Sequence, residues 1–312
     1  MAIEKTLDIL AFGEPLMEFA ATSRGGEQLF LPGHGGDTSN AIIAAARQGA
    51  RTAYFTALGQ DAFGDDFMAL WQREGVDCSS VIRRRDAATG LYFITYGPDG
   101  HQFSYWRAGS AASLVRPDEI PAPQVKSARV LHVSGISQAI STSCSDAVFA
   151  AIQTARANNT LVSYDTNLRL RLWPLERARA VTHAAMAMAD FALPGLDDAQ
   201  QLTGKTTPED ICAFYLALGA RVVALTLGKD GTMVATPEQT RLVPGFPVKA
   251  IDASGAGDTF DGAFLAEWLR NPDPFAAASF ANAAAALATQ GQGAVAPMPR
   301  RDAVLAFMAS KR

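Results

Sequence analysis

Short apolar runs alternate with longer amphipathic segments along most of this chain. Apolar runs of strand length predict β-strands at 7–12, 52–58, 129–133, 161–164, 191–193 and 222–227. Apolar residues at helical spacing predict helices at 37–48, 63–74, 143–157, 175–188, 208–218, 257–269, 274–289 and 302–309. Strands that are apolar throughout belong to sheets covered on both faces. The pattern therefore predicts an α/β fold with a mostly parallel central sheet.

Two regions interrupt this alternation and predict a second, smaller sheet. Residues 14–33 contain strand-like pieces with Gly and Pro, and residues 90–107 predict a hairpin around the turn Gly97-Pro98-Asp99-Gly100. The hairpin carries aromatic residues on both faces, namely Tyr92, Phe93, Tyr96, Phe103, Tyr105 and Trp106. We predict a discontinuous β lid, from about 14–34 and 88–108, within a single domain spanning 1–312. One lid face would cover a ligand, and the other would meet the core or another subunit.

Composition limits the classes of function. The chain has 312 residues, 48% of them hydrophobic, and a net charge of −4, which does not suggest a nucleic-acid surface. Its three cysteines lie far apart, so no disulfide framework or zinc spacing is indicated. Residues 1–10 lack the apolar core of a signal peptide, and the Ala-rich stretch 274–299 is broken by polar residues. We expect a soluble cytoplasmic protein that binds neither nucleic acid nor membrane.

The most informative motif is Gly255-Ala256-Gly257-Asp258, which opens the helix predicted at 257–269. The free N–H groups and positive dipole end of a helix start form an anion site. An acid beside such a site suggests a general base that deprotonates a hydroxyl while the N–H groups hold a phosphoryl group. The alternative is a packing turn whose aspartate only complements the helix dipole.

A second motif, Gly35-Gly36-Asp37 with Asn40, precedes an Ala-rich helix. The glycines allow a ligand to lie against the backbone, and the two polar side chains offer partners for hydroxyl groups. The alternative is a flexible loop that caps the helix. His34 is interpreted as a loop residue, because it has no neighbouring metal ligand in the sequence.

Together these motifs resemble the ribokinase-like (phosphofructokinase-B type) sugar kinases. Gly-Gly-x-x-x-Asn before a helix and Asp-x-x-Gly-Ala-Gly-Asp opening a late one match that family in order and position, over essentially the full chain. The resemblance implies a three-layer α/β/α fold and ATP-dependent phosphorylation of a sugar hydroxyl. In it, Asp258 is the base and the Gly255, Ala256 and Gly257 backbone stabilises the transferring group.

The same resemblance implies a nucleotide site with ATP and Mg²⁺. Its residues would be Asn167, Arg169, Thr226, Gly228, Gly231, Gly255, Gly257 and Asn282. Many members carry Asn-x-x-Glu near the fifth strand, where this chain has Gly195-Leu196-Asp197-Asp198. Asp198 would then act on magnesium through water, since that ion keeps several waters. A requirement for a monovalent cation is left open.

Within this family the chain resembles 2-keto-3-deoxygluconate kinases at Gly90-Leu91-Tyr92, Tyr105-Trp106-Arg107 and 165–173. The substrate-binding residues implied are Gly36, Asp37, Asn40, Tyr92, Tyr105, Arg107, Ile136, Arg169 and Asp258. A sugar acid needs a partner for its carboxylate, and Arg107 can pair with it in bidentate fashion. Arg169 would bridge substrate and phosphate. The expected reaction produces 2-keto-3-deoxy-6-phosphogluconate.

Several alternatives remain at this stage. Another sugar kinase of the family, such as a fructokinase, shares the two motifs. A catalytically silent sugar-binding regulator is opposed by the intact Asp258 and Gly-Ala-Gly turn. A dinucleotide-dependent oxidoreductase is opposed by Phe12-Gly13-Glu14-Pro15, which lacks the glycine fingerprint. The alternative role for Arg107 and Arg169 is a salt bridge with a lid or loop acid. An apolar outer lid face predicts a homo-oligomer.

Overall fold

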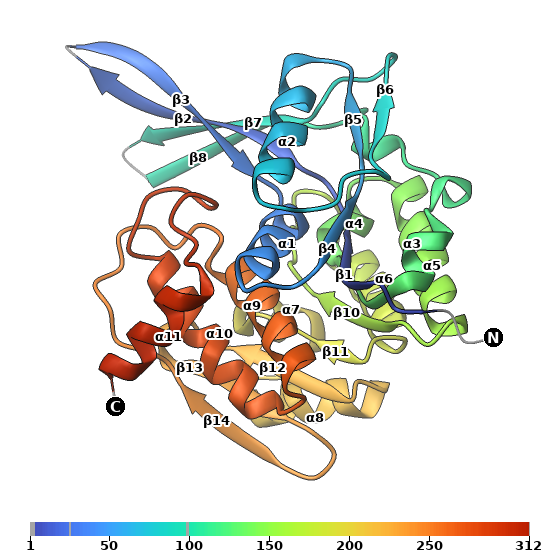
Figure 1. The fold of residues 1–312 in the computed structure, drawn as a ribbon, viewed down its shortest axis with the longest axis vertical. Helices are drawn as coiled ribbons and strands as arrows, with labels where there is room; N and C mark the ends of the chain where they lie inside the picture. Colours follow the sequence, from blue (N-terminus) through green and yellow to red (C-terminus); the bar gives the residue numbers. More distant parts are fainter. Residues whose placement is uncertain (1–3, 25, 98–99, 312) are drawn as a thin grey trace.

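The computed structural model describes residues 4–24, 26–97 and 100–311. Its main sheet has eight strands in the order β14-β13-β12-β11-β10-β9-β1-β4 (Figure 1). The strands are β1 Leu7–Phe12, β4 Thr52–Phe55, β9 Ala128–Ser134, β10 Leu161–Asp165, β11 Phe191–Ala192, β12 Val222–Thr226, β13 Gly231–Ala235 and β14 Thr240–Pro244. All neighbours pair in parallel except β12–β13 and β13–β14. The prediction of a mostly parallel sheet is confirmed.

Helices cover both faces of this sheet and give three α/β/α layers. They are α1 Asp37–Arg47, α2 Ala62–Arg73, α3 Ala122–Ser127, α4 Gly135–Ala139, α5 Thr142–Ala157, α6 Leu175–Met186, α7 Leu196–Thr203, α8 Pro208–Leu218, α9 Ala256–Arg270, α10 Pro274–Ala288 and α11 Arg301–Ser310. Alternate β1 side chains point to opposite faces. Ile9 and Ala11 join the core formed with α1, α9 and α10, whereas Leu10 and Phe12 join the core formed with α5 and α8.

A separate four-stranded sheet has the order β3-β2-β7-β8, and we call it the lid. Its strands are β2 Leu16–Arg24, β3 Glu27–Gly35, β7 Leu91–Gly97 and β8 Gly100–Trp106. Figure 1 shows it projecting from one end of the body, formed by the two chain segments in which the sequence predicted a lid. The predicted turn residues Pro98 and Asp99 lie outside the described residues. The predicted strand at 52–58 divides into β4 and β5 Ala57–Gly59, and β5 pairs with β6 Ile82–Arg84.

The two lid faces have different neighbours. On one face Tyr92 and Tyr105 lie with their ring centroids 5.5 Å apart. On the other face Phe19 stacks on Phe93 at 5.2 Å and meets Phe63 of α2 edge-on at 5.6 Å. The body therefore covers part of this second face.

The described chain offers no helix that is both long and apolar enough to cross a membrane. The Ala-rich stretch 274–299 is α10 followed by turns, and α10 is buried along most of its length.

Candidate active site

Two adjoining cavities, of about 560 and 340 Å³, lie beside the carboxyl ends of the parallel strands. Loops after such strand ends are the usual ligand sites of α/β sheets. Glu14 follows β1, Ile136 follows β9, and Asp165 ends β10. The two cavities share Asn167, Arg169, Ser254, Gly255 and Asp258. A ligand in one cavity is therefore next to a ligand in the other.

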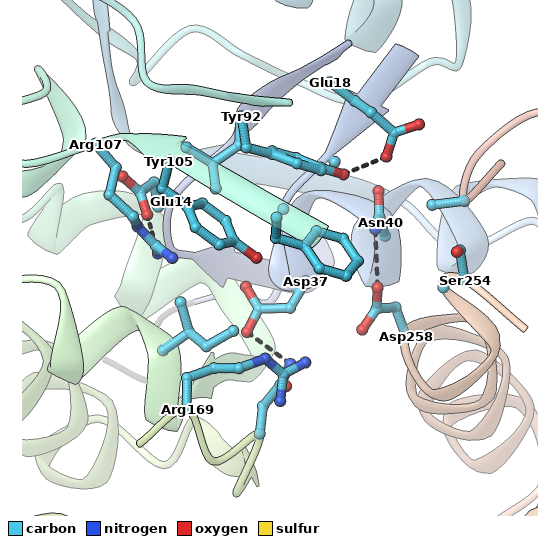
Figure 2. Close-up of a pocket in the computed structure, with 18 of the residues that line it drawn as sticks. Glu14, Glu18, Asp37, Asn40, Tyr92, Tyr105, Arg107, Arg169, Ser254 and Asp258 are labelled. Carbon is cyan, nitrogen blue, oxygen red and sulfur yellow. Dashed lines mark hydrogen bonds and ion pairs between the residues drawn. The ribbon is translucent and has the colours of Figure 1, made fainter. Parts of the chain in front are cut away.

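The first cavity lies between the lid and the body (Figure 2). Every residue that the sequence predicted for the sugar lines it, namely Gly36, Asp37, Asn40, Tyr92, Tyr105, Arg107, Ile136, Arg169 and Asp258. The lid contributes the two tyrosines, α1 and α9 contribute Asp37, Asn40 and Asp258, and the two arginines follow β8 and β10 in the chain. The structure thus brings together residues that are separated by more than two hundred positions in the sequence.

Gly35 and Gly36 occupy positions that a side chain would obstruct. Gly36 has a φ of 109°, and a Cβ there would lie 2.4 Å from the carbonyl oxygen of Glu14. A Cβ on Gly35 would lie 2.6 Å from the hydroxyl oxygen of Tyr92. Both glycines are required for the lid strand β3 to enter α1 at this cavity. These contacts lie within the protein, and the approach of a ligand to this backbone stays a prediction.

Asp258 lies in the first turn of α9, whose N-cap Gly255 has a φ of 69°. The amide of Asn40 donates a hydrogen bond of 2.8 Å to Asp258 Oδ2 (Figure 2). Burial, reinforced by the charge of Asp37, raises the pKa of Asp258 to about 7, against the opposing effects of Asn40 and Arg169. A carboxyl with a pKa near neutrality is well matched to general-base catalysis.

This pKa predicts a pH dependence of catalysis. Because the base must be ionised, we expect kcat/KM for the sugar to rise as the pH increases through about 7. Asn40→Ala removes a hydrogen bond to the carboxylate and should move the inflection to higher pH. Asp37→Asn removes a nearby negative charge and should move it to lower pH. Steady-state pH profiles at saturating ATP measure both shifts, and unchanged inflections in both variants would contradict this assignment.

Arg107 is paired with an acid of the body, Glu14, whose side chain is completely buried. Its Nη2 donates to Glu14 Oε2 (Figure 2). Ser110 Oγ also donates to Glu14, to Oε1 at 3.1 Å. Burial nevertheless raises the pKa of Glu14, although Arg107 opposes that shift. Arg107 Nε is buried without a hydrogen-bond partner among the described residues, and the guanidinium still lines the first cavity. The salt bridge considered from the sequence is present, yet it does not use all five donors of the arginine.

Glu18, on lid strand β2, also lines the first cavity and was missed by the sequence analysis. The Tyr92 hydroxyl donates a hydrogen bond to Glu18 Oε2. Burial raises the pKa of the Glu18 carboxyl. The sequence could have indicated Glu18 through its position between the apolar residues Met17 and Phe19. Alternation along a strand places Glu18 on the face opposite to theirs.

The second cavity lies at the start of α9. The predicted nucleotide residues that line it are Asn167, Arg169, Thr226, Gly255 and Gly257. Asp198 and Ala256 also line it, together with Asp165 and Asp261, to which the sequence analysis gave no role. Because α9 begins here, its free N–H groups are available to an anion in this cavity.

Three predicted nucleotide residues lie away from both cavity linings. Gly228 lies in a turn between β12 and β13, and Gly231 begins β13, where a Cβ would be 2.2 Å from the carbonyl oxygen of Val243. Asn282 accepts from Thr232 Oγ1 at 2.7 Å and donates to the carbonyl oxygens of Val243 and Pro244. These hydrogen bonds of the Asn282 amide connect α10 to the edge strands β13 and β14. Close packing at Gly231 and hydrogen bonding by Asn282 therefore give these two residues roles in holding the fold together.

Asp198 is positioned at the start of α7, where its Oδ2 accepts a 2.8 Å hydrogen bond from the backbone N–H of Leu168. Burial raises the pKa of this carboxyl. Within the described ranges, no group of three or more His, Cys, Asp or Glu side chains is placed to hold a metal ion. Magnesium in phosphate sites is commonly bound by one or two carboxylates, phosphate oxygens and waters. The carboxylates of the second cavity fit that kind of ion.

Arg169 differs from Arg107 in having no carboxylate partner among the described residues. Its Nη1 donates to the Leu168 carbonyl oxygen at 2.8 Å, and its side chain lines both cavities. Asn167, with a φ of 27°, donates to Asp37 Oδ2 at 3.1 Å. Arg171 donates to the Phe103 carbonyl oxygen at 3.2 Å and so connects this loop to the lid.

Comparison with known proteins identifies the class of protein. The model of the pfkB family carbohydrate kinases matches residues 7–301. The 2-dehydro-3-deoxygluconokinase of Bacillus subtilis (strain 168) is 33% identical over 98% of this chain and 97% of its own. Probable fructokinase-2 of Arabidopsis thaliana is also 33% identical, over 96% and 95% of the two chains. The chain therefore belongs to the pfkB family of carbohydrate kinases.

Solved structures give the same fold. A PfkB protein from Polaromonas sp. JS666 has a TM-score of 0.87 and 32% identity, covering 96% of this chain and 100% of its own. A fructokinase from Xylella fastidiosa with bound ATP has a TM-score of 0.90 and 26% identity, covering 99% of both chains. The ribokinase-like fold predicted from the sequence is confirmed. Sequence identity to these relatives does not decide whether the substrate of this chain is a sugar acid or fructose.

Proposed function

We propose that this protein uses ATP to phosphorylate the terminal hydroxyl of 2-keto-3-deoxygluconate, giving 2-keto-3-deoxy-6-phosphogluconate. The observation that carries the proposal is the position of Arg107. It places a guanidinium in the first cavity beside the lid residues Tyr92 and Tyr105, on a different segment from Arg169 and Arg171, which line the same cavity from the loop after β10. A ligand with a carboxylate would find its cationic partner there, and its far end would reach Asp258. The similarity to the B. subtilis enzyme supports the same substrate.

In the proposed reaction, Asp258 accepts the proton of the substrate hydroxyl. The hydroxyl oxygen forms a bond to the γ-phosphorus, and the bond from that phosphorus to the β–γ bridging oxygen breaks. ADP leaves with the electron pair of the broken bond. The backbone N–H groups of Gly255 and Gly257 stabilise the negative charge on the transferring group, and that of Ala256 would join them by leaving the Ala253 carbonyl oxygen, to which it donates at 3.2 Å. The pKa of Asp258, raised to about 7, suits it to this proton transfer.

Arg169 would contact the transferring phosphoryl group, because its side chain lines both cavities. Thr226 and Asn167 would contact the rest of the nucleotide phosphates. Magnesium, when bound, supplies positive charge to the phosphate oxygens, and Asp198 would hold it through water. The roles of Gly228, Gly231 and Asn282 in ATP binding would be indirect, through the shape of the β12–β13 turn and the position of α10.

Recognition of the sugar would use the polar groups around the first cavity. Asp37 and Asn40 would bind hydroxyl groups, and Ile136 would pack against the carbon chain. Tyr92 and Tyr105 would combine apolar ring faces with hydroxyl donors. Arg107 would bind the substrate carboxylate with the donors that Glu14 does not use.

One observation favours a second candidate, a neutral ketose such as fructose. The buried Glu14 carboxylate already compensates the charge of Arg107. With this pair intact, a substrate carboxylate binds less favourably beside Arg107 than it would beside an arginine without an acidic partner. Fructokinases of plants are as similar to this chain as the sugar-acid kinase is.

The product distinguishes these functions. We expect one ADP per sugar phosphorylated with 2-keto-3-deoxygluconate, and a ³¹P signal coupled to the two protons of its terminal carbon. A panel with 2-keto-3-deoxygalactonate, fructose and ribose gives the relative kcat/KM values. ADP release without a sugar phosphate, or a preference for fructose or ribose, would contradict the sugar-acid assignment.

We also propose that the lid pairs with a second copy of this chain in a homo-oligomer. Phe30 and Trp106 both pack against Phe93 on the second lid face and are 39% and 60% exposed, although both are large apolar residues. Burying them against a second lid would remove apolar area from water. Location in the cytoplasm stays a prediction.

A further inference from the structure

Residues 290–298 pack against the start of α9, the turn whose N–H groups face the transferring group in the proposed reaction. Gly255, the N-cap of α9, lies directly against Ala294, because a Cβ on Gly255 would be 3.0 Å from both the Cβ and the carbonyl oxygen of Ala294. Ala294 is itself buried. Protein interiors are closely packed, so a shift of Ala294 would move Gly255 with it.

The far end of this segment is held by Arg47, the last residue of α1. Residues 290–298 contain no helix or strand, so their position depends on contacts with the rest of the protein. Nη1 of Arg47 donates hydrogen bonds of 2.8 and 2.7 Å to the carbonyl oxygens of Val295 and Met298. Both residues are buried, and a charged donor strengthens such hydrogen bonds.

Glu74, which follows α2, fixes the direction of the Arg47 guanidinium. Nε and Nη2 of Arg47 donate to the two carboxylate oxygens of Glu74 at 2.9 and 2.7 Å, which leaves Nη1 for the two carbonyl oxygens. The side chains are only 11% and 10% exposed. Hydrogen bonding by Arg47 lowers the pKa of Glu74, so the pair is charged at neutral pH. A bidentate pair of this kind fixes the plane of the guanidinium.

Helix α1 therefore supports the start of α9 at two points. Asn40 donates to Asp258 Oδ2 at 2.8 Å, and Arg47 lies about two helical turns further along the same side of α1. The two helices are in close contact, since a Cβ on Gly262 of α9 would lie 2.0 Å from the carbonyl oxygen of Ala41. Asn40 contacts the proposed base directly, whereas Arg47 acts on the backbone beside it through residues 290–298.

We propose that Arg47 is a positioning residue for phosphoryl transfer. By holding residues 290–298 against Gly255, it aims the N–H groups at the start of α9 toward the transferring group. Arg47 lines neither cavity, so it acts without touching the sugar or the nucleotide. The inference rests on the proposed role of this turn, but it applies to any sugar that the enzyme phosphorylates. An error of about 1 Å in such a site can cost about a hundredfold in rate.

The double variant Arg47→Met/Glu74→Gln tests this role, because it removes the hydrogen bonds to residues 290–298 without leaving a buried charge unpaired. The assay uses the sugar for which the wild type has the highest kcat/KM. We expect kcat to fall by about tenfold to a hundredfold. The Kd of the sugar, from calorimetric titration, should be nearly unchanged. Arg47→Lys keeps a donor beside the carbonyl oxygens and should recover part of kcat.

A transition-state mimic gives a readout without turnover. ADP with aluminium fluoride resembles the transferring phosphoryl group, so its affinity depends on the N–H groups that face that group. In the double variant its Kd should rise by about the same factor as kcat falls, whereas the Kd of ADP alone should change little.

Arg84→Met/Glu119→Gln is the matched control. Arg84 and Glu119 form a similar buried pair at 2.7 Å, Arg84 also donates to the carbonyl oxygen of Leu114 at 3.2 Å, and neither residue lines a cavity. This control should lose Tm as the first double variant does and keep wild-type kcat at a temperature where both are folded. Equal kcat in the two double variants, or an unchanged affinity for the mimic, would overturn the proposal. A wild-type preference for fructose would contradict only the sugar-acid assignment, since the test then uses fructose.

Discussion

Asp258→Asn should reduce kcat by about 10²- to 10⁴-fold, the usual contribution of a general base. The amide retains the shape of the side chain but cannot accept the hydroxyl proton. Sugar affinity should change little, because Asp37, Asn40 and the lid residues remain. Steady-state kinetics give kcat, and calorimetric titration of the sugar gives its Kd.

A matched variant separates the proton transfer from general helix effects. Asp302→Asn makes the same change in the first turn of α11, at an exposed position away from both cavities. It should retain wild-type kcat. A kcat for Asp258→Asn within a fewfold of the wild type, with folding verified by its Tm, would remove Asp258 as the base.

The second large effect is expected at Arg107. Replacing it alone would leave the buried Glu14 carboxylate without its partner, which is strongly destabilising. The informative protein is therefore the double variant Glu14→Gln/Arg107→Gln, in which both charges are removed. We expect kcat/KM for 2-keto-3-deoxygluconate to fall by about tenfold to 150-fold, corresponding to a charged hydrogen bond of about 1.5–3 kcal/mol. The KM for ATP should be nearly unchanged.

Fructose provides the internal control for this experiment. It has no carboxylate, so its kcat/KM should change much less than that of the keto acid in the double variant. Equal losses for the two sugars would show that the Glu14–Arg107 pair supports the lid rather than reading the carboxylate. A fall in kcat/KM for ATP as large as the fall for the sugar would lead to the same conclusion.

The fold was largely predictable because its buried strands and amphipathic helices have distinct periods. The sequence analysis did not predict β13 and β14, the antiparallel edge. Thr240–Pro244 is mostly exposed, so it lacks the apolar pattern of a buried strand. The short helix α7, Leu196–Thr203, was also missed, since its eight residues give little periodicity.

The two glycine motifs were visible because glycine and polar residues stand out in apolar surroundings, whereas the full set of sugar residues, which lines one cavity, came from the resemblance to 2-keto-3-deoxygluconate kinases. Glu14 and Glu18 were missed because their importance depends on tertiary contacts with Arg107 and Tyr92. Conversely, Asn282 has hydrogen bonds to β13 and β14 that were invisible before those strands were known.

A competition experiment tests the central claim most directly. With wild-type protein, ATP and equal concentrations of 2-keto-3-deoxygluconate and fructose, the early ratio of the two sugar phosphates equals the ratio of their kcat/KM values. Mass spectrometry of the mixture measures this ratio. The account predicts that 2-keto-3-deoxy-6-phosphogluconate predominates by at least about tenfold, from one charged contact. A predominance of fructose phosphate would contradict it and would make Glu14, through its neutralisation of Arg107, the residue that sets specificity.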